Sequence, residues 1–109
     1  MAMLEKSLSG DFDELLRRIE SGITGGSVSA TLEHRSDFAD GGSRCSVRVF
    51  ERYSAIGSNR VSLSVTLFRA ADGPIRLSAI TAGGSQAMFF KINTFGEEAF
   101  LDKLRALLP

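Results

Sequence analysis

Residues 60–67 read Arg-Val-Ser-Leu-Ser-Val-Thr-Leu, a polar and an apolar residue in turn throughout. Because successive side chains of a β-strand point to opposite faces, this alternation predicts a strand with one buried and one exposed face. Three further runs alternate in the same way, with apolar positions at Val28/Ala30/Leu32, Cys45/Val47/Val49 and Ile75/Leu77/Ala79. The middle of the chain therefore predicts four half-buried strands.

The segments between these runs have the composition of tight turns. They are Asp40-Gly41-Gly42, Gly57-Ser58-Asn59 and Asp72-Gly73-Pro74. Turns of this kind join neighbouring strands as hairpins, so we expect an antiparallel meander. A weaker alternation over residues 3–8 and residues 86–92 suggests one more strand at each end, which gives a sheet of four to six strands.

Two amphipathic helices flank the predicted strands. Asp11 with Glu14, and Thr94 with Glu97, have the spacing of a capping box at a helix start. Each helix then carries one apolar stripe, formed by Phe12, Leu15, Leu16 and Ile19 in the first and by Phe100, Leu101, Leu104, Leu107 and Leu108 in the second. Gly22 is expected to end the first helix. A one-sided helix needs an apolar surface, so the pattern predicts a two-layer α+β sandwich with the N-terminal and C-terminal helices on one face of the sheet.

The composition is that of a small globular protein. The chain has 109 residues, of which 43% are hydrophobic and 24% charged, and we expect one domain over residues 1–109. This length excludes a two-domain enzyme. Cys45 has no second cysteine to pair with, which favours a reducing compartment. No signal-peptide pattern and no apolar run of about 18 residues is present, so we expect a cytoplasmic protein without membrane contact.

Three stretches of the chain resemble those of a known group of proteins. They are residues 10–14 (Gly-Asp-Phe-Asp-Glu), residues 44–53 (Arg-Cys-Ser-Val-Arg-Val-Phe-Glu-Arg-Tyr) and residues 81–91 (Thr-Ala-Gly-Gly-Ser-Gln-Ala-Met-Phe-Phe-Lys). The chain is similar in them to small bacterial proteins grouped as a domain of unknown function. The resemblance implies a bacterial, cytosolic, single-domain protein, and it implies no activity.

No residue type points to catalysis. Cys45 and His34 are the one thiol and the one imidazole of the chain, but Cys45 shares the predicted buried face with Val47. One histidine and one cysteine cannot complete a structural zinc site, and no calcium-loop pattern occurs, so no metal and no cofactor is predicted. The acidic clusters at residues 11–14 and residues 97–98 fall in first turns of helices, where capping explains them. We therefore expect a protein that is not an enzyme.

The turn Gly83-Gly84-Ser85-Gln86 is one candidate ligand contact. A glycine-rich bend can direct backbone N–H groups at an anion, and Ser85 and Gln86 would add hydrogen bonds. The lysine and the spacing of a Walker loop are missing. The simpler interpretation is a glycine turn at the end of a strand.

The strand region is basic although the whole chain has no net charge. Residues 44–91 hold seven basic and two acidic side chains, a net charge of +5. The alternation assigns Arg48, Arg52, Arg60 and Arg76, with Phe50 and Phe68, to the exposed face of the sheet. Arginine suits planar contacts with carboxylate or phosphate groups. Such a face could be solvated, bind a polyanion or pack on a second copy of the chain.

Three functions follow from these patterns. The first is a non-enzymatic interaction or ligand-binding module that uses the arginine- and serine-bearing face, as a homodimer. The second is anion or nucleic-acid binding through that face, but the isoelectric point near 6.6 and the missing aromatic motif disfavour nucleic acid. The third is a small ligand carrier or enzyme in which the sheet grips the C-terminal helix, for which the chain is short. We favour the first.

Overall fold

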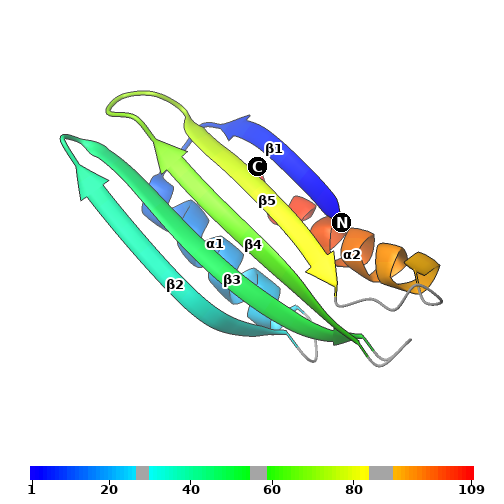
Figure 1. Ribbon diagram of the computed structural model, residues 1–109. Helices are drawn as coiled ribbons and strands as arrows, with labels where there is room; N and C mark the ends of the chain where they lie inside the picture. The colour runs from blue at the N-terminus through cyan, green and yellow to red at the C-terminus, as the bar shows by residue number, and fades with distance from the viewer. Residues whose placement is uncertain (27–29, 55–58, 84–89) are drawn as a thin grey trace.

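The computed structural model describes residues 1–26, 30–54, 59–83 and 90–109. Its elements follow in the order β1 (Ala2–Leu8), α1 (Phe12–Gly25), β2 (Thr31–Asp40), β3 (Ser43–Ser54), β4 (Asn59–Arg69), β5 (Ile75–Gly83) and α2 (Phe90–Arg105). The strands form one antiparallel sheet in the order β1-β5-β4-β3-β2 (Figure 1). The predicted α+β fold is confirmed, and so is the expected strand at residues 3–8, which is β1.

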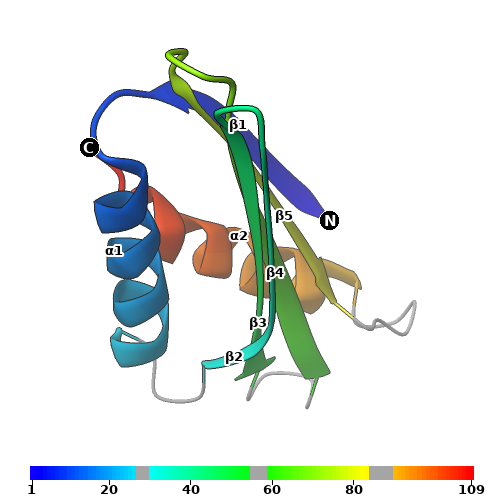
Figure 2. The same ribbon diagram turned by 90° about the vertical axis from the view of Figure 1, so that its left-hand side faces the viewer.

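Both helices lie on the same face of the sheet, as Figure 2 shows from the side. α2 packs against β5, β4 and β1, and α1 contacts β2 and α2. No helix or strand among the described residues covers the other face. The structure is therefore a two-layer sandwich with one layer open.

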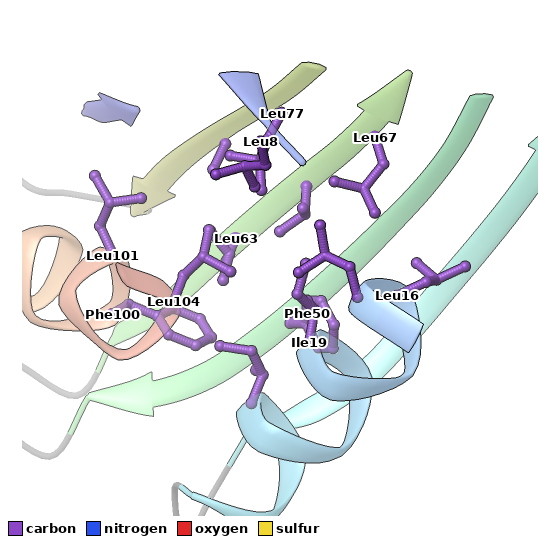
Figure 3. Close-up of a cluster of buried hydrophobic side chains, with 14 of the residues drawn as sticks. Leu8, Leu16, Ile19, Phe50, Leu63, Leu67, Leu77, Phe100, Leu101 and Leu104 are labelled. Atoms are coloured by element: carbon purple, nitrogen blue, oxygen red, sulfur yellow. The ribbon is translucent and has the colours of Figure 1, made fainter. Parts of the chain in front are cut away.

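The core lies between the sheet and the two helices (Figure 3). β4 contributes Val61, Leu63, Val65 and Leu67, each at most 1% exposed. Opposite them lie the predicted apolar stripes of α1 and of α2, of which Ile19, Leu101 and Leu104 have no exposed surface. Burial of this apolar surface is the main force that holds the layers together.

The hairpin between β2 and β3 is the tightest turn of the sheet. Asp40 pairs with Ser43, so only Gly41 and Gly42 form the loop. Both glycines have positive φ, +56° and +85°, as a two-residue turn of type I′ requires. The other two predicted turns also lie between strands, although residues 57 and 58 fall outside the described part of the chain.

The ends of the helices differ in part from the sequence prediction. Asp11 caps α1 as expected, because its carboxylate accepts a hydrogen bond of 2.8 Å from the backbone N–H of Glu14. Gly22 does not end this helix, which continues to Gly25. Its missing side chain instead makes room for Leu107, since a Cβ atom at Gly22 would lie 2.4 Å from a methyl carbon of that leucine.

The start of α2 was also predicted wrongly. α2 begins at Phe90, so Thr94 lies inside the helix and residues 90–92 are helical instead of a strand; residues 86–89 of the expected strand lie outside the described part. Glu97, assigned to a capping box, is 5% exposed and accepts a hydrogen bond of 2.9 Å from the backbone N–H of Gly83. This contact joins the end of β5 to α2.

β2 is longer than the alternation indicated. It runs through the polar segment from Thr31 to Asp40, and His34 lies within it. Residues 28 and 29, where the predicted strand began, lie outside the described part. Because β2 is an edge strand with nearly every side chain exposed, it lacks the apolar period by which a strand is recognised.

Candidate interaction surface

The face of the sheet opposite the helices, here called the open face, is built by one set of alternate residues from each strand. The strand register places on it Met3, Glu5 and Ser7 of β1, Arg76, Ser78, Ile80 and Ala82 of β5, Arg60, Ser62, Ser64, Thr66 and Phe68 of β4, Ser43, Cys45, Val47, Val49, Glu51 and Tyr53 of β3, and Thr31, His34, Ser36, Phe38 and Asp40 of β2. No element among the described residues covers these side chains (Figure 2).

Large apolar side chains are the unusual feature of the open face. Phe38 is 68% exposed, Met3 60%, Phe68 43% and Ile80 40%. Val47 and Val49 lie between them on β3 and are only partly shielded. Single exposed apolar residues are common on protein surfaces, but a group of them on one side of a sheet marks a contact site.

Two aromatic rings and the thiol form a shallow groove at one end of the open face. Phe38, Cys45 and Phe68 are neighbours across β2, β3 and β4, because Cys45 pairs with both phenylalanines. The groove measures about 150 Å³ and its wall is mostly apolar. The prediction that Cys45 is buried in the core is therefore wrong, since it lies half-exposed on the opposite side of the sheet.

The open face carries charged groups of both signs. Arg60 and Arg76 lie there as predicted, together with Glu5, Glu51 and Asp40. Arg60 Nη1 is 3.0 Å from Glu51 Oε1. The face as a whole therefore has no excess of positive charge, in contrast to the basic surface that the composition of residues 44–91 predicted.

Arg48 and Arg52 lie on the covered side of β3, so their assignment to the open face is wrong. The register explains the difference: Phe50 pairs with Leu63 of β4, and both are completely buried. Residues of the same parity as Phe50 must then face the helices. Cys45, Val47 and Val49 had suggested that their side of β3 faces the core, because three apolar residues lie there. The single large ring of Phe50 outweighs them.

Arg48 is held in an ion-pair cluster at the junction of α1, β2 and β3. The side chain is 5% exposed, and its Nε donates to Glu20 Oε2 at 2.5 Å, while Nη2 lies 3.1 Å from Asp37 Oδ1. Burial by itself lowers the pKa of Arg48, but the hydrogen bonds to Glu20 and Asp37 outweigh it and the pKa is raised. Each of the three guanidinium nitrogens of Arg48 thus donates inside the fold, since Nη1 also donates to the carbonyl of Val47.

Arg44 and Arg52 make similar contacts on either side of Arg48. Arg44 pairs with Asp13 of α1 at 2.9 Å and lies 4.0 Å from the ring centre of Phe12. Arg52 stacks on the ring of Phe100 at 4.7 Å and donates to the carbonyl of Gly96 at 3.5 Å; burial lowers its pKa. The arginine row thus fastens the helices to β3.

A spacing of acidic residues in the sequence is a signal for this arrangement. Asp13 and Glu20 are seven residues apart, so they lie on one side of α1, two turns apart. An acidic row on a helix that must cover the sheet predicts a basic row beneath it, and Arg44 and Arg48 supply that row.

The glycine-rich turn yields one described contact. The backbone N–H of Gly83 donates to Glu97, so this group is occupied by the fold. Gly84, Ser85 and Gln86 lie outside the described residues.

The described residues bring no catalytic or metal-binding group together. His34 and Cys45 both lie on the open face, but Cys45 is level with Phe38, four residues along β2 from His34, which corresponds to about 13 Å. Within the described residues, no three His, Cys, Asp or Glu side chains gather as metal ligands would. None of the helices in this part of the chain is both long and apolar enough to cross a membrane.

Comparison with known proteins gives a family but no function. No curated protein and no solved structure matches the chain significantly. A family model described as a family of unknown function, DUF6054, matches residues 1–109, the whole chain. The resemblance of the sequence to a domain of unknown function is thereby confirmed, and the protein belongs to the DUF6054 family.

Proposed function

We propose that this protein is a non-enzymatic interaction module that binds a protein partner through the open face. The proposal is supported above all by the exposed apolar side chains Phe38, Phe68 and Ile80 on a sheet face that no described element covers. Exposure of such groups to water is unfavourable, and a partner that covers them recovers roughly 25 cal/mol for each Å² buried. We also propose, from the resemblance and the lone Cys45, that it works in the bacterial cytoplasm.

An anion-binding function has less support. Two of the four arginines assigned to it, Arg48 and Arg52, lie under the helices, where Arg48 is neutralised by Glu20 and Asp37. On the open face Arg60 pairs with Glu51. The hydroxyl groups of Ser62, Ser64 and Thr66 remain, but they do not provide the positive field that attracts a polyanion.

A ligand carrier or enzyme has less support for a different reason. The space between sheet and helices is filled by side chains such as Phe50, Phe100 and Leu63, which are all completely buried (Figure 3). A helix-grip carrier needs that space for its ligand. The groove at Phe38, Cys45 and Phe68 is shallow and lies on the outside.

Footprinting with hydroxyl radicals tests whether the open face is covered in the cell. Phe38, Phe68 and Ile80 are expected to react strongly in dilute purified protein and several-fold less in an extract of cells that produce it naturally. Leu108, partly exposed at the end of the chain, serves as the control off the open face, and buried Phe100 reports that the protein is folded. Equal and strong labelling of the open face under both conditions would contradict the proposed function.

A further inference from the structure

We infer that the partner of the open face is a second copy of the same chain, packed sheet against sheet about a two-fold axis. This inference rests on the proposed function, because it names the occupant of the same surface. The size, the charge and the shape of that face support it.

The open face has the area that a stable dimer needs. Five strands at about 4.8 Å spacing give a width of about 24 Å, and an average of about ten residues at about 3.3 Å gives a length of about 33 Å. The product is about 800 Å², which equals the area that each partner contributes to a typical stable interface. The face is therefore large enough to bury a complete interface without help from the helices.

The charge of the open face suits contact with itself. It carries both signs, Arg60 and Arg76 with Glu5, Glu51 and Asp40, so the formal charges of these groups sum to only −1. A partner of strongly positive or negative charge would leave at least two of them opposed by like charge, which is costly in an interface. A second copy offers both signs again.

The shape of the open face allows a second sheet to approach. The middle strand of the sheet, β4, carries three small hydroxyl side chains there, Ser62, Ser64 and Thr66. Facing sheets pack about 10 Å apart, which small central side chains permit. Val49 and Ile80 both flank Ser64, one on each side. A two-fold axis along β4 would set Val49 of each copy against Ile80 of the other, as an isologous contact requires.

The two edges of the sheet are weaker candidates for self-association. β2 has a register irregularity between Leu32 and His34 and carries Asp37 and Asp40, and β1 at the other edge has only 7 residues, with Glu5 and Lys6 among them. Short strands, bulges and charged residues are the features by which proteins prevent pairing between edge strands. We therefore place the contact between two copies on the open face.

Sedimentation velocity of the purified protein over a range of concentrations tests the inference. We expect a species of twice the 11.8 kDa chain at micromolar concentration. Ser64→Arg places a long cation at the centre of the contact, where it would face the same arginine of the second copy. Repulsion between the two charges should raise the dimer Kd by about tenfold or more. Ser21→Arg makes the same change at an exposed site on α1 and should leave the Kd unchanged.

A second variant separates loss of the dimer from loss of the fold. Ile80→Ser removes a 40% exposed side chain and should weaken the dimer while circular dichroism stays native. A wild type that remains monomeric at all concentrations, or a dimer that both variants leave intact, overturns the inference. If the protein is monomeric alone while its open face is protected in the extract, the partner is another protein and the proposed function stands. If there is neither dimer nor protection, both are wrong.

Discussion

Arg48 shows how a charged residue can be part of the interior of this small protein. Its guanidinium reaches Glu20 on one side, Asp37 on the other and the carbonyl of Val47 at 2.9 Å. Glu20 and Asp37 keep 25% and 53% of their side-chain surface exposed, so the cluster opens to water at its edge. The cost of burying the positive charge is offset by these three contacts.

Replacing Arg48 by alanine should destabilise the protein by about 2–3 kcal/mol. Loss of one partner of a buried pair costs roughly 3–5 kcal/mol, and the exposure of Glu20 and Asp37 reduces this figure. Arg18→Ala removes an exposed pair with Glu14 on α1 and should cost less than about 0.5 kcal/mol. Urea unfolding of both variants measures the difference. Equal losses would mean that the Arg48 cluster contributes no more than a surface ion pair.

Asp37 should make stability fall in acid. The hydrogen bond from Ser46 and the contact with Arg48 lower its pKa below the ordinary 3.8. Its folded-state pKa is lower than its unfolded one, so the stabilisation is complete above pH 3.8 and is lost as the pH falls through the folded-state value. Comparing urea midpoints at about pH 6 and about pH 3 should show a smaller decrease for Asp37→Asn than for the wild type. Ser46→Ala, which removes the 2.6 Å donor, should have the same effect. An unchanged decrease in both variants would assign the acid sensitivity to other carboxylates.

Among the elements, α2 closes the core over the half of the sheet formed by β1, β5 and β4. Phe100, Leu101 and Leu104 are completely buried there, and Arg52 stacks on the ring of Phe100. α1 depends more on ion pairs, since Asp13 and Glu20 join it to β3. The two helices are thus fixed by different forces on the same sheet.

Leu104→Ala should cost about 2–5 kcal/mol, because it leaves a cavity at a site with no exposed surface. Leu108→Ala, three residues past the end of α2, changes a partly exposed side chain and should cost less. The free energy of unfolding in urea measures both. A melting temperature unchanged by Leu104→Ala would show that α2 does not support the core.

Over the molecule as a whole, the two layers leave one sheet face without a cover. The open face combines apolar rings at Phe38 and Phe68 with charges of both signs, and the covered face uses its arginines to hold the helices. The groups proposed to contact a partner are thus separate from those that stabilise the fold. This separation is why variants such as Ile80→Ser can test the proposed interface without unfolding the chain.

The periodicity of the sequence determined the fold class, the two amphipathic helices, β1 and the strands β3 to β5. Local patterns suffice there because a buried face leaves a period of 2 or 3.6 in any sequence. β2 showed this period only up to Leu32, because it is an edge strand with most of its side chains exposed, and the start of α2 was placed too late.

Only the tertiary structure decided which side of β3 faces the core. Both sides of this strand carry apolar residues, Cys45, Val47 and Val49 on one and Phe50 on the other. Alternation therefore shows which residues share a side but not which side faces the core. The choice depends on partners far along the chain: Leu63 meets Phe50, and Asp13 and Glu20 neutralise Arg44 and Arg48. These partners lie between 13 and 31 positions apart in the chain, so their pairing is a property of the packed layers, and it turned a predicted arginine face into an apolar one.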